Sequence, residues 1–515
     1  MSELPEGWSV TKADVVCEKL RGVSYDKSEA SREERDGYVP ILRANNIDSD
    51  HLTFEDLVFV PRTRVSEKQK LQVNDVVVAM SSGSKSVVGK TAQMLGSWNG
   101  SFGAFCGVLR PTAHIDGRYF GYFFRTKEYR LKVSELSAGT NINNLKNEHF
   151  AEINFPLAPL NEQRRIVAKL EKLLSRVDAA QARLATIPRI LKRFRQSVLA
   201  AACSGRLTAD WRRDNVISET VGERLANIKR ARLALAKTAS EASRIAETLD
   251  RIDCNFDDDA PKDWLVFKAE TICDFITKGT TPNTKEVTSS GDIPFLKVQH
   301  IVKNKLDFNS LPYFVSSEVH NHFLKRSKVY PRDVLMNIVG PPLNKVAIVP
   351  SDFPEWNINQ ALAIFRPVEG VSPEYLQLAL SHEETLEHIT RETRGIVGQS
   401  NISLEQCRDL KILVPPLTEQ QEIVRRVESL FKTADALEAR YRTAKAHVDK
   451  LTQSILARAF RGELVTTEAE LARLEGRDYE PASLLLERIR QERGANDAGK
   501  QTRRQKRAAS PSLPY

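Results

Sequence analysis

Apolar residues recur at alternating intervals of four and three positions along two stretches of the chain, residues 166–198 and residues 423–455. A sustained 4-3 spacing averages 3.5 residues and is typical of the seam of a coiled coil. Prolines precede both stretches, and Gly205 and Gly462 follow them as helix stop signals. The pattern predicts two long helices. Their seams would pair with each other, although packing of each helix on its own domain is the alternative.

The two helical stretches belong to a longer internal repeat. PLAPLNEQRRIV at 156–167 aligns with LVPPLTEQQEIV at 413–424, so Pro159 matches Pro416 at an offset of 257 (416 − 159 = 257). Upstream, LPEGWSV resembles APKDWLV, VPILRANNI resembles IPFLKVQHI, and VLRP resembles IFRP. Each copy therefore consists of a variable module followed by a closely matching helical segment. The paired tryptophans, Trp8 and Trp264, are predicted to be core residues.

This layout predicts an α+β fold: two tandem α/β modules separated by two long antiparallel coiled-coil spacer helices, with a pseudo-two-fold internal repeat. Because the chain runs module, helix, module, helix, an antiparallel pairing would place one module at each end. The expected divisions are the first module (1–155), a central spacer (156–208), a charged helical connector (209–258), the second module (259–412), a distal spacer (413–464), and a C-terminal helix with a basic disordered tail (465–515).

The run SSGSKSVVGKT at 81–91 follows an apolar stretch and resembles the start of a nucleotide-binding P-loop. Five residues separate Gly83 from Gly89, where that motif requires four. The residues after Thr91 are too rich in glycine and small polar residues for the helix that a P-loop must open. The other copy, VGPPLNK, keeps only Lys345. The run is therefore interpreted as a surface loop or as a loop that contacts nucleic acid.

Charge and cysteine usage narrow the class of protein. A formal net charge of +9 and a pI near 9.1 favour a polyanionic partner. No apolar stretch approaches the roughly 20 residues that cross a bilayer, so we expect no membrane association. The six cysteines form no Cys-x-x-Cys pair, which indicates reduced thiols in a cytoplasm and no zinc site. His320 and His322 are interpreted as surface residues rather than a metal-ligand pair, and no metal site is expected.

The chain resembles the specificity subunit of a type I restriction–modification enzyme. Such a subunit has two variable modules that alternate with two helical segments, which here begin PLxxLNEQxxIV and PPLTEQQEIV. Residues 1–465 carry the resemblance. It implies that each module is a target recognition domain for one half of a bipartite site in double-stranded DNA. It also implies partners, namely two methyltransferase subunits docked on the helices, and restriction subunits. S-adenosylmethionine, ATP and Mg would be used by those partners, and this prokaryotic cytoplasmic chain would bind none of them.

The residues support a non-catalytic reader independently, because the sequence holds no amino-methyltransferase motif and no proper P-loop. A stand-alone sequence-specific DNA-binding regulator remains the alternative. The seam and docking positions are Leu160, Ile166, Leu170, Leu173, Val177, Leu184, Leu191, Leu417, Ile423, Val427, Leu430, Leu437, Val448 and Leu451.

Base edges and phosphates are bound mainly by Arg, Lys, Asn, Gln and Ser side chains. Residues of these types, with one histidine, lie in the polar loops of both modules. The predicted DNA-binding residues are Arg43, Asn45, Asn46, Ser81, Ser82, Ser84, Lys85, Lys90, Asn141, Asn143, Lys297, Gln299, His300, Asn344, Lys345, Gln399 and Asn401.

Overall fold

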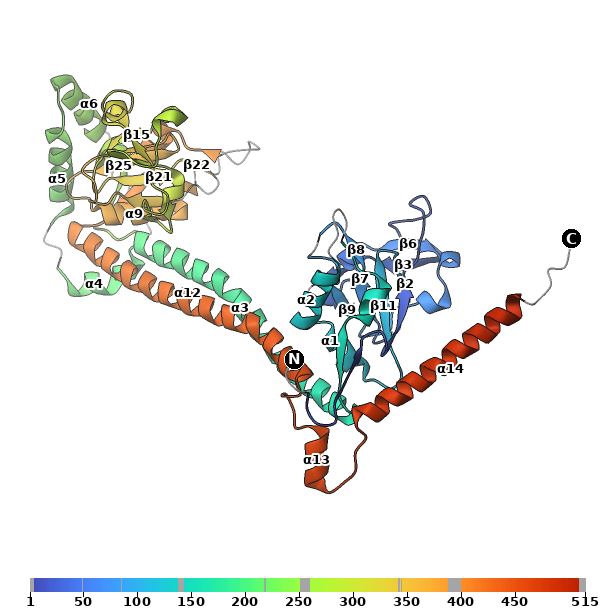
Figure 1. Cartoon of the computed structure of the whole chain (residues 1–515). Coiled ribbons are helices and arrows are strands. Elements are labelled where there is room, and N and C mark those ends of the chain that lie inside the picture. The colour runs from blue at the N-terminus through green and yellow to red at the C-terminus, as the bar shows by residue number, and fades with distance from the viewer. Residues whose placement is uncertain are drawn as a thin grey trace. The chain divides into compact units, whose positions relative to one another are not determined.

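The chain divides into two compact units. The computed structural model describes residues 4–48, 50–84, 86–137, 143–216, 219–250, 260–340, 343, 345–387 and 400–508. Unit 1 comprises residues 1–185 and 443–515, and unit 2 comprises residues 186–442. Each unit contains one predicted module and part of each long helix, α3 (Leu160–Cys203) and α12 (Leu417–Phe460), which are labelled in Figure 1.

Unit 1 is built on a four-stranded antiparallel sheet in the order β2-β11-β7-β9. One of its two central strands, β7, has the sequence VVVA and is buried along its whole length, as expected for a strand that is apolar on both faces. The strands of unit 1 are β1 (Ser9–Lys12), β2 (Cys17–Arg21), β3 (Tyr38–Leu42), β4 (Ile47–Asp48), β5 (His51–Leu52), β6 (Val58–Pro61), β7 (Val76–Ala79), β8 (Ser81–Ser82), β9 (Thr91–Gln93), β10 (Ser101–Phe102), β11 (Cys106–Pro111), β12 (Asn143–Asn144) and β13 (Asn154–Leu157).

Unit 2 repeats this topology. Its four-stranded antiparallel sheet has the order β15-β25-β21-β23, and a parallel pair, β16 with β24, corresponds to the parallel pair β3 with β10 in unit 1. The strands of unit 2 are β14 (Leu265–Lys268), β15 (Cys273–Lys278), β16 (Ile293–Leu296), β17 (Ile301–Val302), β18 (Lys305–Leu306), β19 (Phe314–Val315), β20 (Lys328–Val329), β21 (Val334–Asn337), β22 (Val339–Gly340), β23 (Val346–Ile348), β24 (Trp356–Ile358), β25 (Leu362–Pro367), β26 (Ser400–Asn401) and β27 (Lys411–Val414).

Helices complete both units. The two long helices are 44 residues each, α3 (Leu160–Cys203) and α12 (Leu417–Phe460), and both cross from one unit to the other along the chain. The other α-helices within the described residues are α1 (Gly117–Phe123), α2 (Lys127–Leu136), α4 (Ala209–Asp214), α5 (Val221–Ala234), α6 (Ala239–Asp250), α7 (Ala269–Ile272), α8 (Ser317–Asn321), α9 (Pro373–Ser381), α11 (Leu404–Asp409), α13 (Glu468–Glu475) and α14 (Ala482–Ala508).

The long helices pack together in antiparallel fashion within each unit. In unit 1, Ile166 and Leu170 near the start of α3 share a core with Leu456 near the end of α12. In unit 2, Val198 near the end of α3 shares a core with Ile423 near the start of α12. The α+β fold with paired long helices is thus confirmed.

Burial along the predicted seam is uneven. Leu174 is 6% exposed and belongs to the unit 1 core, whereas the predicted seam residue Leu173 is only half-buried. A straight α-helix has 3.6 residues per turn, so its apolar face drifts from a strict 3.5-residue repeat. On α12, Leu437 is 48% exposed. The residues of the seam are therefore most deeply buried where the helices lie beside the modules.

Both helix stops use glycine for a conformational reason. Gly205 and Gly462 have φ angles of 76° and 75°, in the left-handed region that favours glycine. A Cβ atom would lie 2.5 Å from Pro261 Cγ at Gly205, and 2.2 Å from Pro5 Cγ at Gly462. Each long helix therefore ends directly against the first residues of a module in its own unit.

The connector and the C-terminal region contain equivalent helices. Ile228 of α5 packs in the unit 2 core, and Ile489 of α14 packs in the unit 1 core. Arg232 of α5 and Arg493 of α14 donate to the main-chain oxygens of Asp274 and Asp14, respectively. The helix α14 continues to Ala508, within the range 465–515 that was predicted to contain a C-terminal helix and a basic tail. Its Lys, Arg, Gln and Ala residues are good helix formers.

Candidate nucleic-acid interface

The Gly-Lys-Thr run forms a turn between two strands. Gly89 has φ of 72°, and a Cβ atom there would lie 2.1 Å from Val133 Cγ1 of α2. Thr91 begins β9 and donates its hydroxyl to Phe124 O at 2.9 Å. A strand rather than a helix follows the lysine, so this loop lacks the helix N-terminus with which a P-loop holds phosphate.

Three predicted DNA-binding residues from two polar loops meet in unit 1. Asn45, Ser82 and Lys90 line an open hollow of about 510 Å³, together with Asp48 and Glu55. Ser81 and Ser82 form β8, which pairs with Asn143–Asn144 of β12. The segment that follows β7 is therefore held beside β12. Ser84 is exposed, and its hydroxyl is hydrogen-bonded to that of Ser86 at 2.9 Å.

The same main-chain arrangement occurs in unit 2. Ala79 N donates to Lys90 O in unit 1, and Asn337 N donates to Lys345 O in unit 2, both at 2.9 Å. Lys345 is therefore the structural counterpart of Lys90, as the alignment of the two loops predicts. Asn401 is exposed on β26, opposite Val339 of β22, in the place that β12 occupies in unit 1.

Asn46 stabilises its own turn. Its side chain is 1% exposed, with Oδ1 accepting from Arg43 N at 2.9 Å and Nδ2 donating to Glu55 O at 2.8 Å. The Arg43 guanidinium donates to Asp56 O and Oδ2, and Asn45 Nδ2 donates to the same carboxylate at 3.3 Å. In this structure Asn46 is internal, whereas Arg43 and Asn45 lie nearer the surface.

His300 has the corresponding role in unit 2. It is 1% exposed, its Nδ1 accepts from Lys297 N, and its Nε2 lies 2.9 Å from Leu311 O. Burial lowers the pKa of His300, which favours the neutral ring that this pair of contacts requires. Lys297 Nζ lies 3.8 Å from the centroid of the Tyr313 ring, and Gln299 Nε2 donates to the Tyr313 hydroxyl at 3.4 Å.

Some of the predicted positions lie outside the described residues. The backbone of Asn143 is described in β12, but its side chain is not. The predicted residues that fall wholly outside are Lys85, Asn141, Asn344 and Gln399.

The repeated Glu-Gln pair at the start of each long helix joins that helix to its module. Trp8 Nε1 donates to Glu162 Oε1, and Trp264 Nε1 donates to Glu419 Oε2, both at 2.9 Å. Both glutamates are fully buried, and both tryptophans belong to the core as predicted. The neighbouring Gln163 accepts from Asp116 N at 2.9 Å. These joints were not among the predicted functional residues, although the exact repetition of Glu-Gln in the sequence was the available signal.

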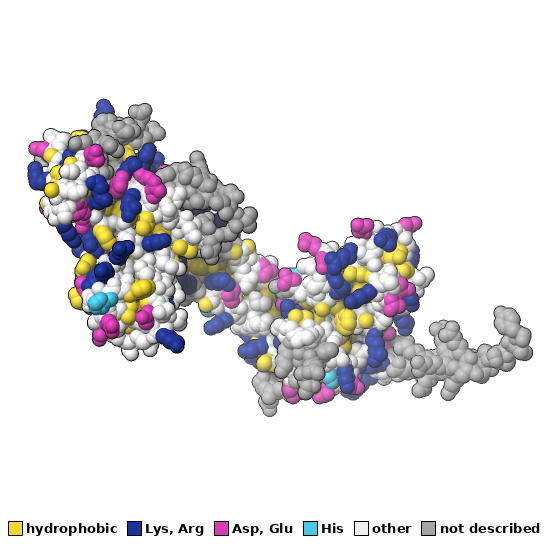
Figure 2. Space-filling view, turned by 90° about the horizontal axis from the view of Figure 1, so that it is seen from above, with side chains coloured by type: hydrophobic (Ala, Val, Ile, Leu, Met, Phe, Trp, Pro, Cys, Tyr) yellow, Lys and Arg dark blue, Asp and Glu magenta, His cyan; other side chains and the backbone are white. Residues whose placement is uncertain are grey.

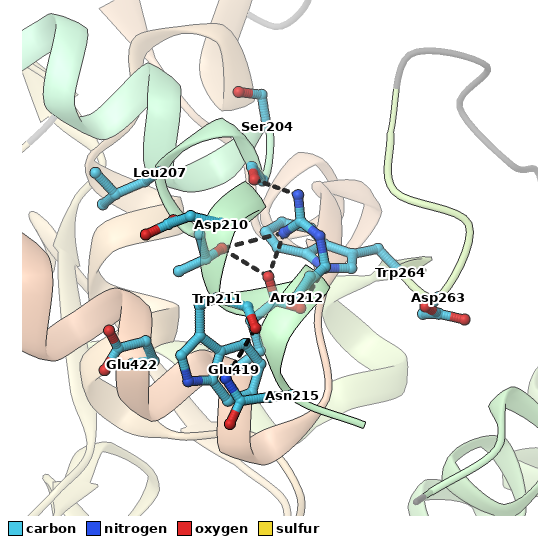
Figure 3. Close-up of polar contacts among 12 residues, drawn as sticks. Ser204, Leu207, Asp210, Trp211, Arg212, Asn215, Asp263, Trp264, Glu419 and Glu422 are labelled. Atoms are coloured by element: carbon cyan, nitrogen blue, oxygen red, sulfur yellow. Dashed lines mark hydrogen bonds and ion pairs between the residues drawn. The ribbon is translucent and has the colours of Figure 1, made fainter. Parts of the chain in front are cut away.

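Figure 3 shows the unit 2 joint, where Glu419, Arg212 and Trp264 converge. Thr208 Oγ1 also donates to Glu419, at 2.6 Å. Glu419→Ala removes the acceptor shared by these three donors, and we expect it to lower the free energy of unfolding by roughly 3 kcal/mol. Glu428→Ala, at an exposed position of the same helix, should leave the melting curve unchanged. Equal melting of the two variants would show that the joint contributes no stability.

Charged and apolar side chains are mixed on the visible surface of both units. Lys and Arg side chains occur across the visible surface of each unit, interspersed with apolar and acidic side chains (Figure 2). Among the described residues, no group of three or more His, Cys, Asp or Glu side chains could hold a metal ion. In the same part of the chain, no helix is long and apolar enough to span a bilayer.

Comparison with known proteins decides the family. The family model described as the type I restriction modification DNA specificity domain matches residues 5–189 and again residues 261–445. This chain belongs to the family of type I restriction–modification specificity subunits. The double match gives each unit one specificity domain, and the internal repeat of the sequence is thereby accounted for.

Full-length relatives within the specificity-subunit family are similar to the chain from end to end. The EcoKI specificity subunit of Escherichia coli (strain K12) is 36% identical over 508 residues, covering 98% of this chain and 99% of the relative. The StySPI specificity subunit of Salmonella potsdam is 37% identical over 524 residues, with the same coverage. A chain in a solved structure of a type I R-M system covers 90% of this chain and 100% of its own length, with 18% identity and a TM-score of 0.60. That likeness shows the fold.

Proposed function

We propose that this chain is the non-catalytic DNA-reading subunit of a cytoplasmic type I restriction–modification complex. Each module reads one half of a bipartite site in double-stranded DNA. The observation that carries the proposal is the duplicated sheet edge, where Lys90 and Lys345 occupy equivalent places at the ends of equivalent sheets. Two such readers in one chain fit a site with two separate halves.

The long helices are the proposed docking surface for two methyltransferase subunits. Leu437 lies on α12 and is 48% exposed, so an apolar side chain is available to a partner. In this proposal S-adenosylmethionine is used by the methyltransferase subunits, and ATP and Mg by restriction subunits.

Copurification tests the proposed assembly. When the chain is expressed with its methyltransferase subunit, the two should elute together at a fixed ratio of two methyltransferase chains to one. Leu437→Asp should reduce that yield, because a carboxylate in an apolar interface is unfavourable. Arg440→Ala, at an exposed position on the same helix, is the matched control. A chain that binds its DNA site while never retaining a methyltransferase would instead be a stand-alone regulator.

Lys90 provides a test of the DNA-binding edge. Lys90→Ala should weaken DNA binding several-fold and reduce the slope of log affinity against log salt by about 0.9, the value for one lost phosphate contact. The control is Lys12→Ala, because Lys12 lies on β1 and bonds Asn154 at 2.7 Å, away from the hollow. Filter binding across a salt series measures both quantities. An unchanged slope for Lys90→Ala would place this lysine outside the DNA contact.

A further inference from the structure

One large apolar side chain stands at the proposed DNA-binding edge of the first module. Phe105 is 70% exposed, the highest exposed fraction among the large apolar side chains described within residues 4–155. It lies in the turn between β10 and β11, where Cys106 N donates to Gly103 O at 2.8 Å. Its neighbours Gly103 and Ala104 are small, so they add little bulk around the ring.

The backbone of Phe105 is fixed against the loop that carries the serines. Met80 N and Ser81 N both donate to Phe105 O, at 2.8 and 3.3 Å. Ser82 and Lys90 line the hollow described above, and Lys90 O accepts from Ala79 N at the same end of β7. The aromatic residue is therefore anchored at the sheet edge that holds the predicted phosphate and base contacts.

The second module has no such ring at the equivalent position. Ile338 N donates to Ala361 O at 3.0 Å, which repeats the bond from Met80 N to Phe105 O. Ala361 therefore replaces Phe105, as the alignment of VLRP with IFRP also places it. A residue needed for the fold of this turn would be expected in both copies. The difference between the copies points to a role in reading one half-site.

We propose that Phe105 is a specificity-determining residue of the first module and makes an apolar contact with a thymine in the first half-site. The proposal rests on the proposed function, in which this module reads DNA. Thymine is the base that presents an apolar group, its C5 methyl, in the major groove. An exposed phenyl ring, on a residue whose backbone oxygen accepts from Ser81 N, matches that group, whereas the ring offers no hydrogen bond to the other base edges. Because Phe105 has no aromatic counterpart in the second module, the contact is confined to one half-site.

The test uses the full chain with its methyltransferase partner and a duplex carrying the mapped site. Phe105→Ala should lower affinity on the order of tenfold, and Phe105→Leu should lose less, because it keeps an apolar side chain. In the wild type, deoxyuridine in place of one thymine of the first half-site should weaken binding to a similar extent. The same replacement should have little further effect on Phe105→Ala, since the methyl contact is already lost.

Leu95→Ala is the matched control. Leu95 is 55% exposed, and its neighbour Met94 bonds Asp75 and Asn74 at the opposite end of β7. This variant should bind as the wild type does and respond equally to deoxyuridine. If Phe105→Ala keeps wild-type affinity and wild-type discrimination, the proposal is wrong while the bipartite reading stands. The proposal would also be overturned if Phe105→Ala loses base discrimination at a base pair that contains no thymine. A wild-type chain that reads no bipartite site would overturn the proposed function itself.

Discussion

Replacement of residues 1–155 with the first module of another specificity subunit is expected to change one half of the recognised site and leave the other half intact. Each unit has its own sheets, its own core and its own Trp–Glu joint. A mismatched base pair typically costs about 1–3 kcal/mol. A wholly changed half-site should therefore shift preference by several orders of magnitude.

The exchange must preserve the contacts that the first module makes with the helices in its unit. Trp8 Nε1 donates to Glu162. The ring centroids of Tyr119 and Phe123 lie 5.0 and 5.6 Å, respectively, from the ring centroid of Phe460 at the end of α12. A donor module that keeps these aromatic residues is the appropriate choice. Exchange of residues 259–412 is the reciprocal control and should change the other half. If a folded chimera changes both halves, the modules read cooperatively.

A seven-residue insertion in both long helices is expected to lengthen the unread gap between the half-sites. Insertion after Ala185 in α3 and after Arg442 in α12 uses equivalent points of the repeat, where the chain also passes between the two units. Seven residues preserve the 4-3 phase and add about 10 Å of helix. At 3.4 Å per base pair, the gap should grow by up to about 3 base pairs.

The half-site sequences themselves should not change in this experiment, because neither module is altered. Three residues inserted in α3 alone are the control, and should break the pairing register and lower stability or partner binding. Sequencing of the methylated positions reads out the gap. A folded double insertion with the original gap would mean that the helices do not set the spacing.

The internal repeat could be predicted from the sequence, because both copies keep the residues that join each long helix to its module. The Glu-Gln pairs, the terminal glycines and the two tryptophans recur at nearly constant offsets, and both units repeat the Trp–Glu hydrogen bond and the approach of a proline to the terminal glycine. The long helices could be predicted from their 4-3 spacing. The pattern could not predict which of two adjacent leucines, Leu173 or Leu174, is buried, because that depends on the local winding of the helix.

The candidate site was harder to predict from sequence because polar side chains have two uses. Asn46 and His300 have the hydrogen-bonding groups that base edges require, yet in this structure they bond the backbone of their own turns. Asn in a short turn commonly has this role, and the sequence does not distinguish it from base recognition. The exposure of Phe105 could not be predicted for the opposite reason: an apolar residue beside a strand is normally assigned to the core, and only the fold shows that it is exposed.

The most direct measurement is a genome-wide map of methylated adenines in cells with and without this gene. We predict that one bipartite sequence, two short specified halves around an unspecified gap, is methylated only when the gene is present. An identical map in the two strains, with the methyltransferase expressed in both, would contradict a role in specificity. A gene-dependent site that is continuous rather than split would contradict the assignment of one half-site to each module.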